Sequence, residues 1–252
     1  MLSSASRLDE LVALLPGTVR RASFLGGCPE ARLSTGFPDL DDLLGGGIPR
    51  GDLTEVVALG SAGATTLAYR LCLEITRSAL AAWIDAPDAL DPASAAASGI
   101  DLERLLWVRP PDLGAALVAT EMVLRMGGFP LVLLDIGNHV GSPSTLRHPS
   151  EPRPGRGRAS SSRALAAPHT WLRLTRAAAG SRSALLVLRH SRGSGEPLLG
   201  SFAAVRLGLS TAAPRWDRAG GAPELLAGLD LSISIARRRS ARPSSTVRVR
   251  AE

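Results

Sequence analysis

The sequence predicts an α/β fold with a mostly parallel central sheet, helices on both faces and a short helical arm at the N-terminus. Two observations lead to this fold class. Short apolar runs alternate with segments of helical periodicity along most of the chain, which is the pattern of strand–helix–strand units. Some runs are almost wholly apolar, such as LVLLDI at 131–136, which suits strands that are buried on both faces of a parallel sheet.

The elements are expected in the following order. Strands are predicted at the apolar runs Leu53–Leu59, Ala81–Asp85, Leu105–Val108, Leu131–Ile136 and Ala184–His190. Helices are predicted where apolar residues recur with helical spacing, at Thr65–Ser78, Pro92–Ser98, Gly114–Met126 and Thr170–Ala179. Further strands are expected at Phe202–Leu209 and Leu229–Ala236, which alternate partially, and at the TVRVR stretch, which alternates like an edge strand.

Two segments stand apart from this alternation. Residues 1–23 are expected to form a helical arm, because Leu8, Leu11, Val12 and Leu15 recur with helical spacing before a Pro-Gly stop. So short a helix is unstable alone in water, so it must dock on the chain's own core or on a partner. Residues 141–168 hold five Pro, three Gly and five Arg, and are expected to form a flexible basic insertion.

Cysteine content and hydropathy restrict the compartment. Two cysteines, Cys28 and Cys72, cannot build a disulfide framework, so a reducing compartment is expected. No apolar run reaches the roughly 20 residues of a membrane-spanning helix, and the first residues include acids that a signal peptide lacks. We therefore expect a cytoplasmic protein without membrane contact.

Charge is distributed unevenly along the chain. All 29 basic residues are arginine, so lysine-based chemistry is excluded. Residues 1–139 hold 10 arginines and 17 acids, a net charge of −7, whereas residues 140–252 hold 19 arginines and 6 acids, a net charge of +13. This asymmetry suits an anionic partner, either nucleic acid or an acidic protein surface, or else marks a solvated basic face.

The stretch GSAGATTL, Gly60 to Leu67, lies between a predicted strand and a predicted helix, as a phosphate-binding loop does. In the pattern GxxxxGK[ST], Gly63 and Thr65 are in place, but Ala58 replaces the first glycine and Ala64 replaces the lysine. Asp135, at the end of a later strand, is a candidate for the second carboxylate of a magnesium site.

The surrounding motifs carry a resemblance to a known family. The stretch Leu33–Leu67 resembles the start of the RecA recombinase core, in which an STG turn, a Leu-Asp pair and a glycine-rich turn lead through a strand into the P-loop. The resemblance continues in WIDAPDALDP, GIDLERLLWVRP, LVLLDI, SALLVLRH, FAAVRLGL and SISIARRRSARP, and so covers about residues 33–250. It implies a RecA-like core at 24–250, with no separate C-terminal lobe.

Four nucleotide-handling positions depart from that family. Pro87 lies at the position of the acidic catalytic residue, Ala64 at the P-loop lysine, Ser94 at the ring against the adenine, and His190 at the γ-phosphate-sensing glutamine. Hydrolysis is not expected, because proline cannot polarise water and alanine cannot bridge phosphates. We expect no catalytic residue, no metal and no cofactor beyond weak nucleotide or phosphate binding at a vestigial site of Ser61, Gly63, Ala64, Thr65, Thr66, Asp91 and Asp135.

The resemblance also implies surfaces for DNA and protein. RecA-type filaments bind single strands through two loops, which here correspond to 141–168 and to the short segment after His190; the candidate contacts are Arg153, Arg156, Arg158, Arg163 and Arg192. Both loops lack aromatic residues, so only weak, salt-sensitive and nonspecific DNA contact is expected. Arg237 and Arg239 match basic residues that reach across the filament interface, and mark either a protein-contact surface or a solvated strand end.

A RecA-like chain of this length without ATPase residues is most similar to the ImuA family, accessory proteins of bacterial inducible-mutagenesis cassettes. The resemblance implies a noncatalytic adaptor in SOS-induced translesion synthesis that binds RecA and an ImuB-type Y-family polymerase homologue, and works with an error-prone polymerase. The candidate partner-binding residues are Leu8, Leu11, Arg237 and Arg239. Three alternatives stay open: an ATP-driven recombinase paralogue, a SulA-like cell-division inhibitor that contacts FtsZ, and a plain DNA-binding module.

Overall fold

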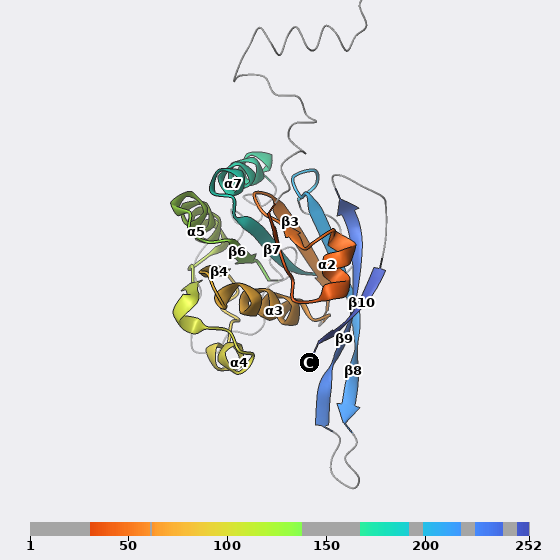
Figure 1. Cartoon of the computed structure of the whole chain (residues 1–252). Helices are drawn as coiled ribbons and strands as arrows, with labels where there is room; N and C mark the ends of the chain where they lie inside the picture. The colour runs from red at the N-terminus through yellow and green to blue at the C-terminus, as the bar shows by residue number, and fades with distance from the viewer. Residues whose placement is uncertain are drawn as a thin grey trace, which may run out of the picture. The chain divides into compact units, whose positions relative to one another are not determined.

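An eight-stranded, mostly parallel sheet forms the centre of the computed structural model (Figure 1). The structure describes residues 31–60, 62–137, 167–191, 199–217, 225–238 and 246–251. The sheet order is β10-β9-β8-β3-β7-β6-β4-β5. Its strands are β3 (Leu53–Leu59), β4 (Ala81–Asp85), β5 (Leu105–Val108), β6 (Leu131–Asp135), β7 (Ala184–Ser191), β8 (Val205–Asp217), β9 (Leu225–Arg238) and β10 (Thr246–Ala251).

The parallel part of the sheet runs from β8 to β5, and β9 and β10 complete it in antiparallel pairing. The five strands predicted for the parallel part are all present, and β3, β4 and β5 have the predicted bounds. The prediction succeeded here because these strands are apolar on both faces, a pattern that few other structures produce. The TVRVR stretch lies in β10 at the end of the sheet, which confirms the predicted edge strand.

Helices cover both faces of the sheet, so the predicted fold class is confirmed (Figure 1). On one face, α2 (Pro38–Leu44), α3 (Ala64–Thr76) and α4 (Pro92–Ala97) contribute to an apolar cluster with residues of β3, β8 and β9. On the other face, α5 (Leu113–Met126) and α7 (Pro168–Ser181) pack on β4, β6 and β7. A 3₁₀ turn, η2 (Leu102–Arg104), leads into β5.

Helix α7 begins earlier than the sequence pattern indicated. Its first residue is Pro168, inside the segment predicted as a loop, and Ala167 precedes it with extended backbone. Proline is favoured at the first helical position because its missing N–H has no partner there in any case. Outside the described residues lie the rest of the predicted insertion, the N-terminal arm with Leu8 and Leu11, and the candidate DNA contacts Arg153, Arg156, Arg158, Arg163 and Arg192.

Strands β8 and β9 are longer than predicted and form a two-stranded ribbon (Figure 1). Strand β8 pairs with β3 only from Val205 to Leu209, but with β9 along its length, with three register irregularities. Antiparallel pairing satisfies the backbone groups of the ribbon beyond the edge of β3. The sequence prediction ended β8 too early, at Leu209, and began β9 too late, at Leu229, because the outer parts of these strands alternate weakly.

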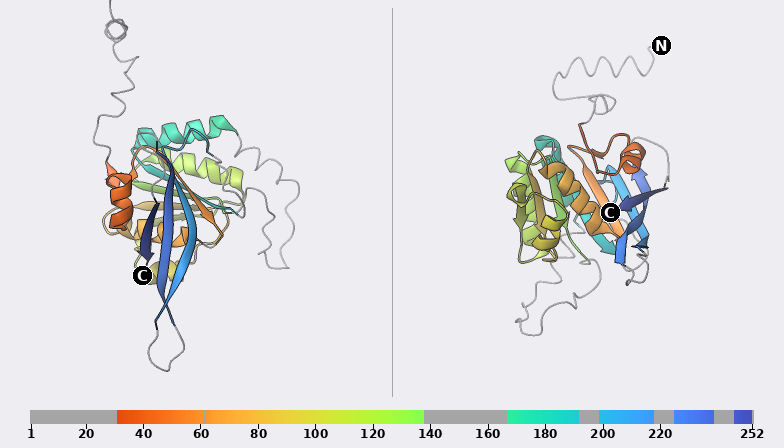
Figure 2. Two further views of the ribbon diagram at one scale, coloured as in Figure 1. Left: turned by 90° about the vertical axis from the view of Figure 1, so that its right-hand side faces the viewer. Right: turned by 60° about the horizontal axis from the view of Figure 1, so that its bottom comes forward.

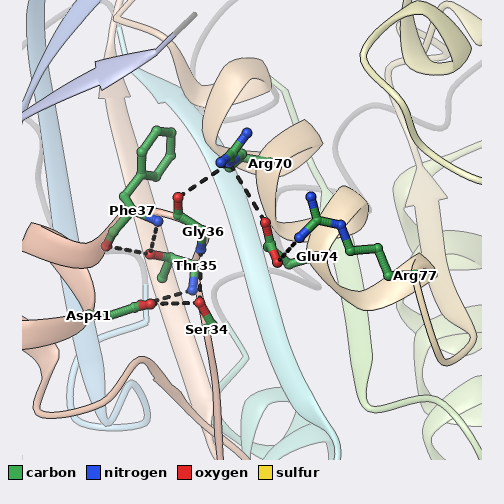
Figure 3. Close-up of polar contacts among 8 residues, drawn as sticks. All are labelled: Ser34, Thr35, Gly36, Phe37, Asp41, Arg70, Glu74 and Arg77. Atoms are coloured by element: carbon green, nitrogen blue, oxygen red, sulfur yellow. Dashed lines mark hydrogen bonds and ion pairs between the residues drawn. The ribbon is translucent and has the colours of Figure 1, made fainter.

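The segment before β3 forms a small hairpin and a helix that the sequence prediction missed. Strands β1 (Arg32–Leu33) and β2 (Ile48–Pro49) pair in antiparallel fashion, and α2 lies between them. Figure 3 shows how Asp41 holds the STG turn: its carboxylate accepts hydrogen bonds from Ser34 Oγ at 2.7 Å and from the Thr35 amide at 2.8 Å. The Arg70 guanidinium donates to the Gly36 carbonyl at 3.3 Å, which ties the turn to α3.

We expect Asp41→Ala to lower the free energy of unfolding by about 1–3 kcal/mol, because it leaves the partly buried Thr35 amide and the Ser34 hydroxyl without their acceptor. Urea denaturation of both proteins measures the difference. Asp42→Ala is the matched control, since Asp42 is an exposed neighbour in the same helix. Equal losses in the two variants would show that the carboxylate network contributes nothing beyond helix propensity.

Candidate nucleotide site

The candidate site lies at the carboxyl ends of the parallel strands, where open α/β sheets bind their ligands. The loop after β3 leads into α3, and Asp85 and Asp135 are the last residues of the neighbouring strands β4 and β6. His190 is the second-to-last residue of β7. The fold therefore brings together the ends of four strands that the sequence analysis had assigned to one site.

The loop has the backbone form of a phosphate-binding loop but an apolar lining. Gly63 has left-handed backbone, with φ at +80°, and α3 begins at Ala64. A Cβ added to Gly63 would overlap Cδ2 of Leu231 from β9, so a larger residue would have to displace this leucine side chain and also adopt an unfavourable backbone conformation. Ala62 and Ala64 belong to the same apolar cluster as Leu231, and Ala64 is only 2% exposed. The lysine position of the pattern is therefore part of the hydrophobic core.

Asp135 is a buried acid of the site, as is Asp85. The carboxylate of Asp135 accepts a hydrogen bond from the Gly137 amide at 2.8 Å, and Asp85 lies directly opposite it on β4. Burial raises the pKa of Asp135 to about 6 from its ordinary 3.8, while the Gly137 hydrogen bond and His190 act in the opposite direction. The nearby Asp85 adds a smaller upward contribution to this pKa.

Because the pKa of Asp135 is raised, its ionisation lowers the stability of the folded state as the pH rises. The folded state disfavours ionised Asp135, so its contribution is fully present below about pH 4 and is lost as the pH rises through about 6. Asp135→Asn cannot ionise and still accepts a hydrogen bond from Gly137. Between about pH 4 and pH 8, we expect the variant to gain about 2–3 kcal/mol of unfolding free energy relative to the wild type.

Urea denaturation across this pH range measures the effect. Asp42→Asn, which alters an exposed carboxylate, is the matched control. If Asp135→Asn followed the wild type at every pH, the carboxyl would be equally solvated in the folded and unfolded states.

Two other acids of this region are engaged in local structure. Asp85 accepts hydrogen bonds from the amides of Ala89 and Leu90, at 3.0 and 2.9 Å, and from Trp107 Nε1 at 3.2 Å. Sequence reasoning missed this role of Asp85, because its partners converge only in the folded chain. Asp91 caps α4, and hydrogen bonds from Ser94 lower its pKa. The Asp-Pro pair before a short helix is a capping signal by which this role could have been predicted, although Asp91 was assigned to the nucleotide site instead.

The other predicted site residues lie as follows. Thr65 is exposed in the first turn of α3, and Thr66 follows it half-buried. Pro87 lies in the turn after β4, close in sequence to the exposed ion pair between Asp88 and Arg109. Arg237 is opposite Arg206 in the β8–β9 register. Ser61, Arg192 and Arg239 lie outside the described residues.

Two kinds of site are absent from the described part of the chain. No three His, Cys, Asp or Glu side chains there form a group that could hold a metal ion. Likewise, none of the helices that the structure describes combines the length and the hydropathy needed to cross a membrane.

A strand, a glycine turn and a helix N-terminus at the carboxyl edge of a parallel sheet define a P-loop-type α/β protein, here without the loop lysine. Comparison with known proteins specifies this class: residues 28–142 match the family model of the RecA N-terminal domain. The chain is RecA-like over this region.

Curated relatives point the same way. The chain is 40% identical to protein RecA of Rubrobacter xylanophilus over 141 residues, which are 53% of this chain and 41% of that protein. It is 34% identical to protein RecA of Picosynechococcus sp. over 120 residues, which are 47% of this chain and 34% of that protein. It is 41% identical to protein RecA of Borrelia hermsii over 106 residues, which are 41% of this chain and 30% of that protein. The chain thus spans less than half of each relative's length.

Proposed function

We propose that this chain is a noncatalytic RecA-like adaptor of DNA repair, which acts in SOS-induced translesion synthesis by binding RecA and an ImuB-type polymerase homologue. The similarity to RecA proteins supports the connection to DNA repair or recombination. The buried Ala64 carries the noncatalytic part of the proposal. A P-loop lysine neutralises the outer phosphates, whereas this position is an apolar contact within the core.

The roles of Asp85 and Asp91 also support a site that does not hydrolyse nucleotide. Asp85 and Asp91 accept hydrogen bonds from the protein's own backbone, so their carboxylates hold a turn and a helix end. At position 87, proline offers neither a general base nor an N–H. Among the described residues of the vestigial site, Thr65, Thr66 and Asp135 are then the polar side chains left to meet a nucleotide, and they do not replace a lysine and a catalytic carboxylate.

An apolar helix face supports the adaptor role. Val118, Met122 and Met126 follow one another at every fourth position of α5, so they lie on one side of the helix. Their exposed fractions are 56%, 61% and 71%, although solvent-facing helix positions are normally polar. Exposed apolar surface of this kind marks protein contact, and methionine adapts its shape to a partner. We call Val118, Met122 and Met126 the α5 stripe, and we propose that this stripe contacts RecA.

The first experiment titrates the full chain with a fluorescent ATP analogue in magnesium, with RecA as the positive control, and measures phosphate release in parallel. We expect no saturable binding and no turnover for this chain. Tight binding, or turnover that Asp135→Asn abolishes, would overturn the noncatalytic assignment and favour the ATP-driven recombinase alternative.

The second experiment measures capture of purified RecA, bound to single-stranded DNA, by the immobilised chain. We expect capture by the wild type and at least about a tenfold loss with Met122→Glu, because a carboxylate would be desolvated in an apolar contact. Leu80→Glu, which alters a leucine that is 45% exposed before β4, is the matched control. Absence of capture, or equal loss in both variants, would overturn the assignment of RecA or of the α5 stripe.

A further inference from the structure

A second surface lies on the face of the sheet that α5 and α7 cover, but over β3, β8 and β9. Helices α5 and α7 cover this face over β4, β6 and β7. Towards β8 and β9, Figure 2 shows the sheet continuing away from these two helices. There the sheet is hollowed into a groove of about 180 Å³, which we call the ribbon groove. Its lining includes Val57 and Leu59 of β3, Arg206 and Gly208 of β8, and Ser234 and Ala236 of β9.

Small side chains create the groove. Strand β9 alternates large buried residues, such as Leu231, Ile233 and Ile235, with Ser234 and Ala236 on the groove side. Gly208 lies opposite Ser234, whose hydroxyl donates to the Gly208 carbonyl at 3.2 Å. A Cβ on Gly208 would approach this hydroxyl to 2.9 Å. A shallow trough therefore replaces the ridge of side chains that a sheet face normally presents.

The ribbon groove is apolar at one end and positive at the other. Leu59 is 45% exposed at the end of β3, where no core packing requires a leucine. Arg206 lies at the other end with 12% of its side chain exposed. Its Nε donates to Glu55 Oε2 at 2.6 Å and one Nη donates to the Gly200 carbonyl at 3.2 Å. None of the described residues accepts a hydrogen bond from the other Nη.

A second guanidinium group lies beneath the groove. Arg189 of β7 lies with its Nε 3.7 Å from Glu55 Oε1, the other oxygen of the carboxylate that Arg206 contacts. All three side chains are almost wholly buried, and a partner brought to this position meets their charge with little screening by water. Complementarity with the groove requires a negatively charged group beside an apolar one.

We propose that the ribbon groove binds an extended peptide segment of a partner protein, with an aliphatic side chain against Leu59 and an Asp or Glu carboxylate on Arg206. The volume is below the roughly 300–1,000 Å³ of small-molecule pockets, so it suits single side chains of a larger partner. Single-stranded nucleic acid fits poorly, since the lining provides one arginine and no aromatic ring for stacking. This proposal does not depend on whether RecA binds the α5 stripe.

The experiment selects a phage-displayed library of random peptides against the full immobilised chain and measures the dissociation constants of enriched peptides by fluorescence anisotropy. We expect enriched peptides to share an acidic residue and an aliphatic residue a few positions apart, because Arg206 and Leu59 lie at opposite ends of the groove. Exchange of that Glu for Gln, or Asp for Asn, should weaken binding by about tenfold or more, as loss of a hydrogen bond between charged groups does.

Variants of the chain locate the binding surface. Ala236→Trp fills the groove from an exposed strand position and should abolish binding, whereas Ala97→Trp, at an exposed position of α4, should not change it. Circular dichroism verifies that both variants are folded. The proposal is overturned if no peptide is enriched, if acidic residues are not shared, if Ala236→Trp binds like the wild type, or if only single-stranded oligonucleotides bind and compete at this surface.

Discussion

Replacing Gly47 by alanine is expected to lower the free energy of unfolding by about 3 kcal/mol or more, because two separate penalties coincide at this position. The backbone of Gly47 has φ at +112°, a conformation that residues with a Cβ rarely adopt. A Cβ there would also overlap the backbone carbonyl of Leu33, with which β1 pairs to β2. A backbone group held by strand pairing cannot move aside as a flexible side chain can.

Gly128→Ala separates the two penalties. Gly128 also has positive φ, at +83°, but a Cβ there meets no atom within 4 Å. Its alanine variant should lose only the conformational part, about 1–2 kcal/mol. Urea denaturation of the wild type and both variants measures the two losses. If the two variants lost equal free energy of unfolding, the overlap of the new Cβ with the Leu33 carbonyl would have no energetic cost. The strands β1 and β2 would then have moved apart to accommodate it.

The second large effect is expected at Glu55, at the centre of the sheet. Glu55→Gln should lower the free energy of unfolding by about 3–5 kcal/mol, because it removes the carboxylate charge that two buried guanidinium groups face. Glu55 lies on β3, and its partners Arg189 and Arg206 lie on the flanking strands β7 and β8, so the loss acts on three strands together. Burial already lowers the pKa of Arg189.

Two further variants test this explanation. Glu55→Gln combined with Arg189→Met also removes one of the two guanidinium charges and should recover part of the loss. Glu74→Gln is the surface control, since its partners Arg70 and Arg77 are largely exposed, and it should cost at most about 1 kcal/mol. A double variant as unstable as Glu55→Gln alone would assign the effect to packing and not to charge.

The sequence predicted the centre of the fold better than its margins. Strands β3, β4, β6 and β7 are largely buried on both faces, so their composition alone distinguishes them from helices and loops. The hairpin of β1 and β2 has strands of two residues, too short for any periodicity, and its position depends on Gly47 and the Asp41 network. The outer parts of β8 and β9 are stabilised by pairing with each other, which composition does not reveal.

The candidate site was predicted in location but not in the state of its side chains. The P-loop pattern identified the turn at Gly63 and the absence of lysine. That Ala64 is a core residue beside Leu231 could not be deduced, because β9 follows more than a hundred residues later and its packing is a property of the whole sheet. The same applies to the engagement of Asp85, whose partner Trp107 lies on another strand.

The position of β3 also affects how the chain folds during its synthesis on the ribosome. Strand β3 pairs with β7 on one side and with β8 on the other, and the ion pair of Glu55 with Arg206 joins residues 151 positions apart. During synthesis, both edges of this apolar strand therefore stay unpaired until the ribosome has released most of the chain. Contacts so distant in sequence slow folding, because a long loop must close before they form. The central strand of the native sheet is thus the segment of the nascent protein that needs protection from aggregation for longest.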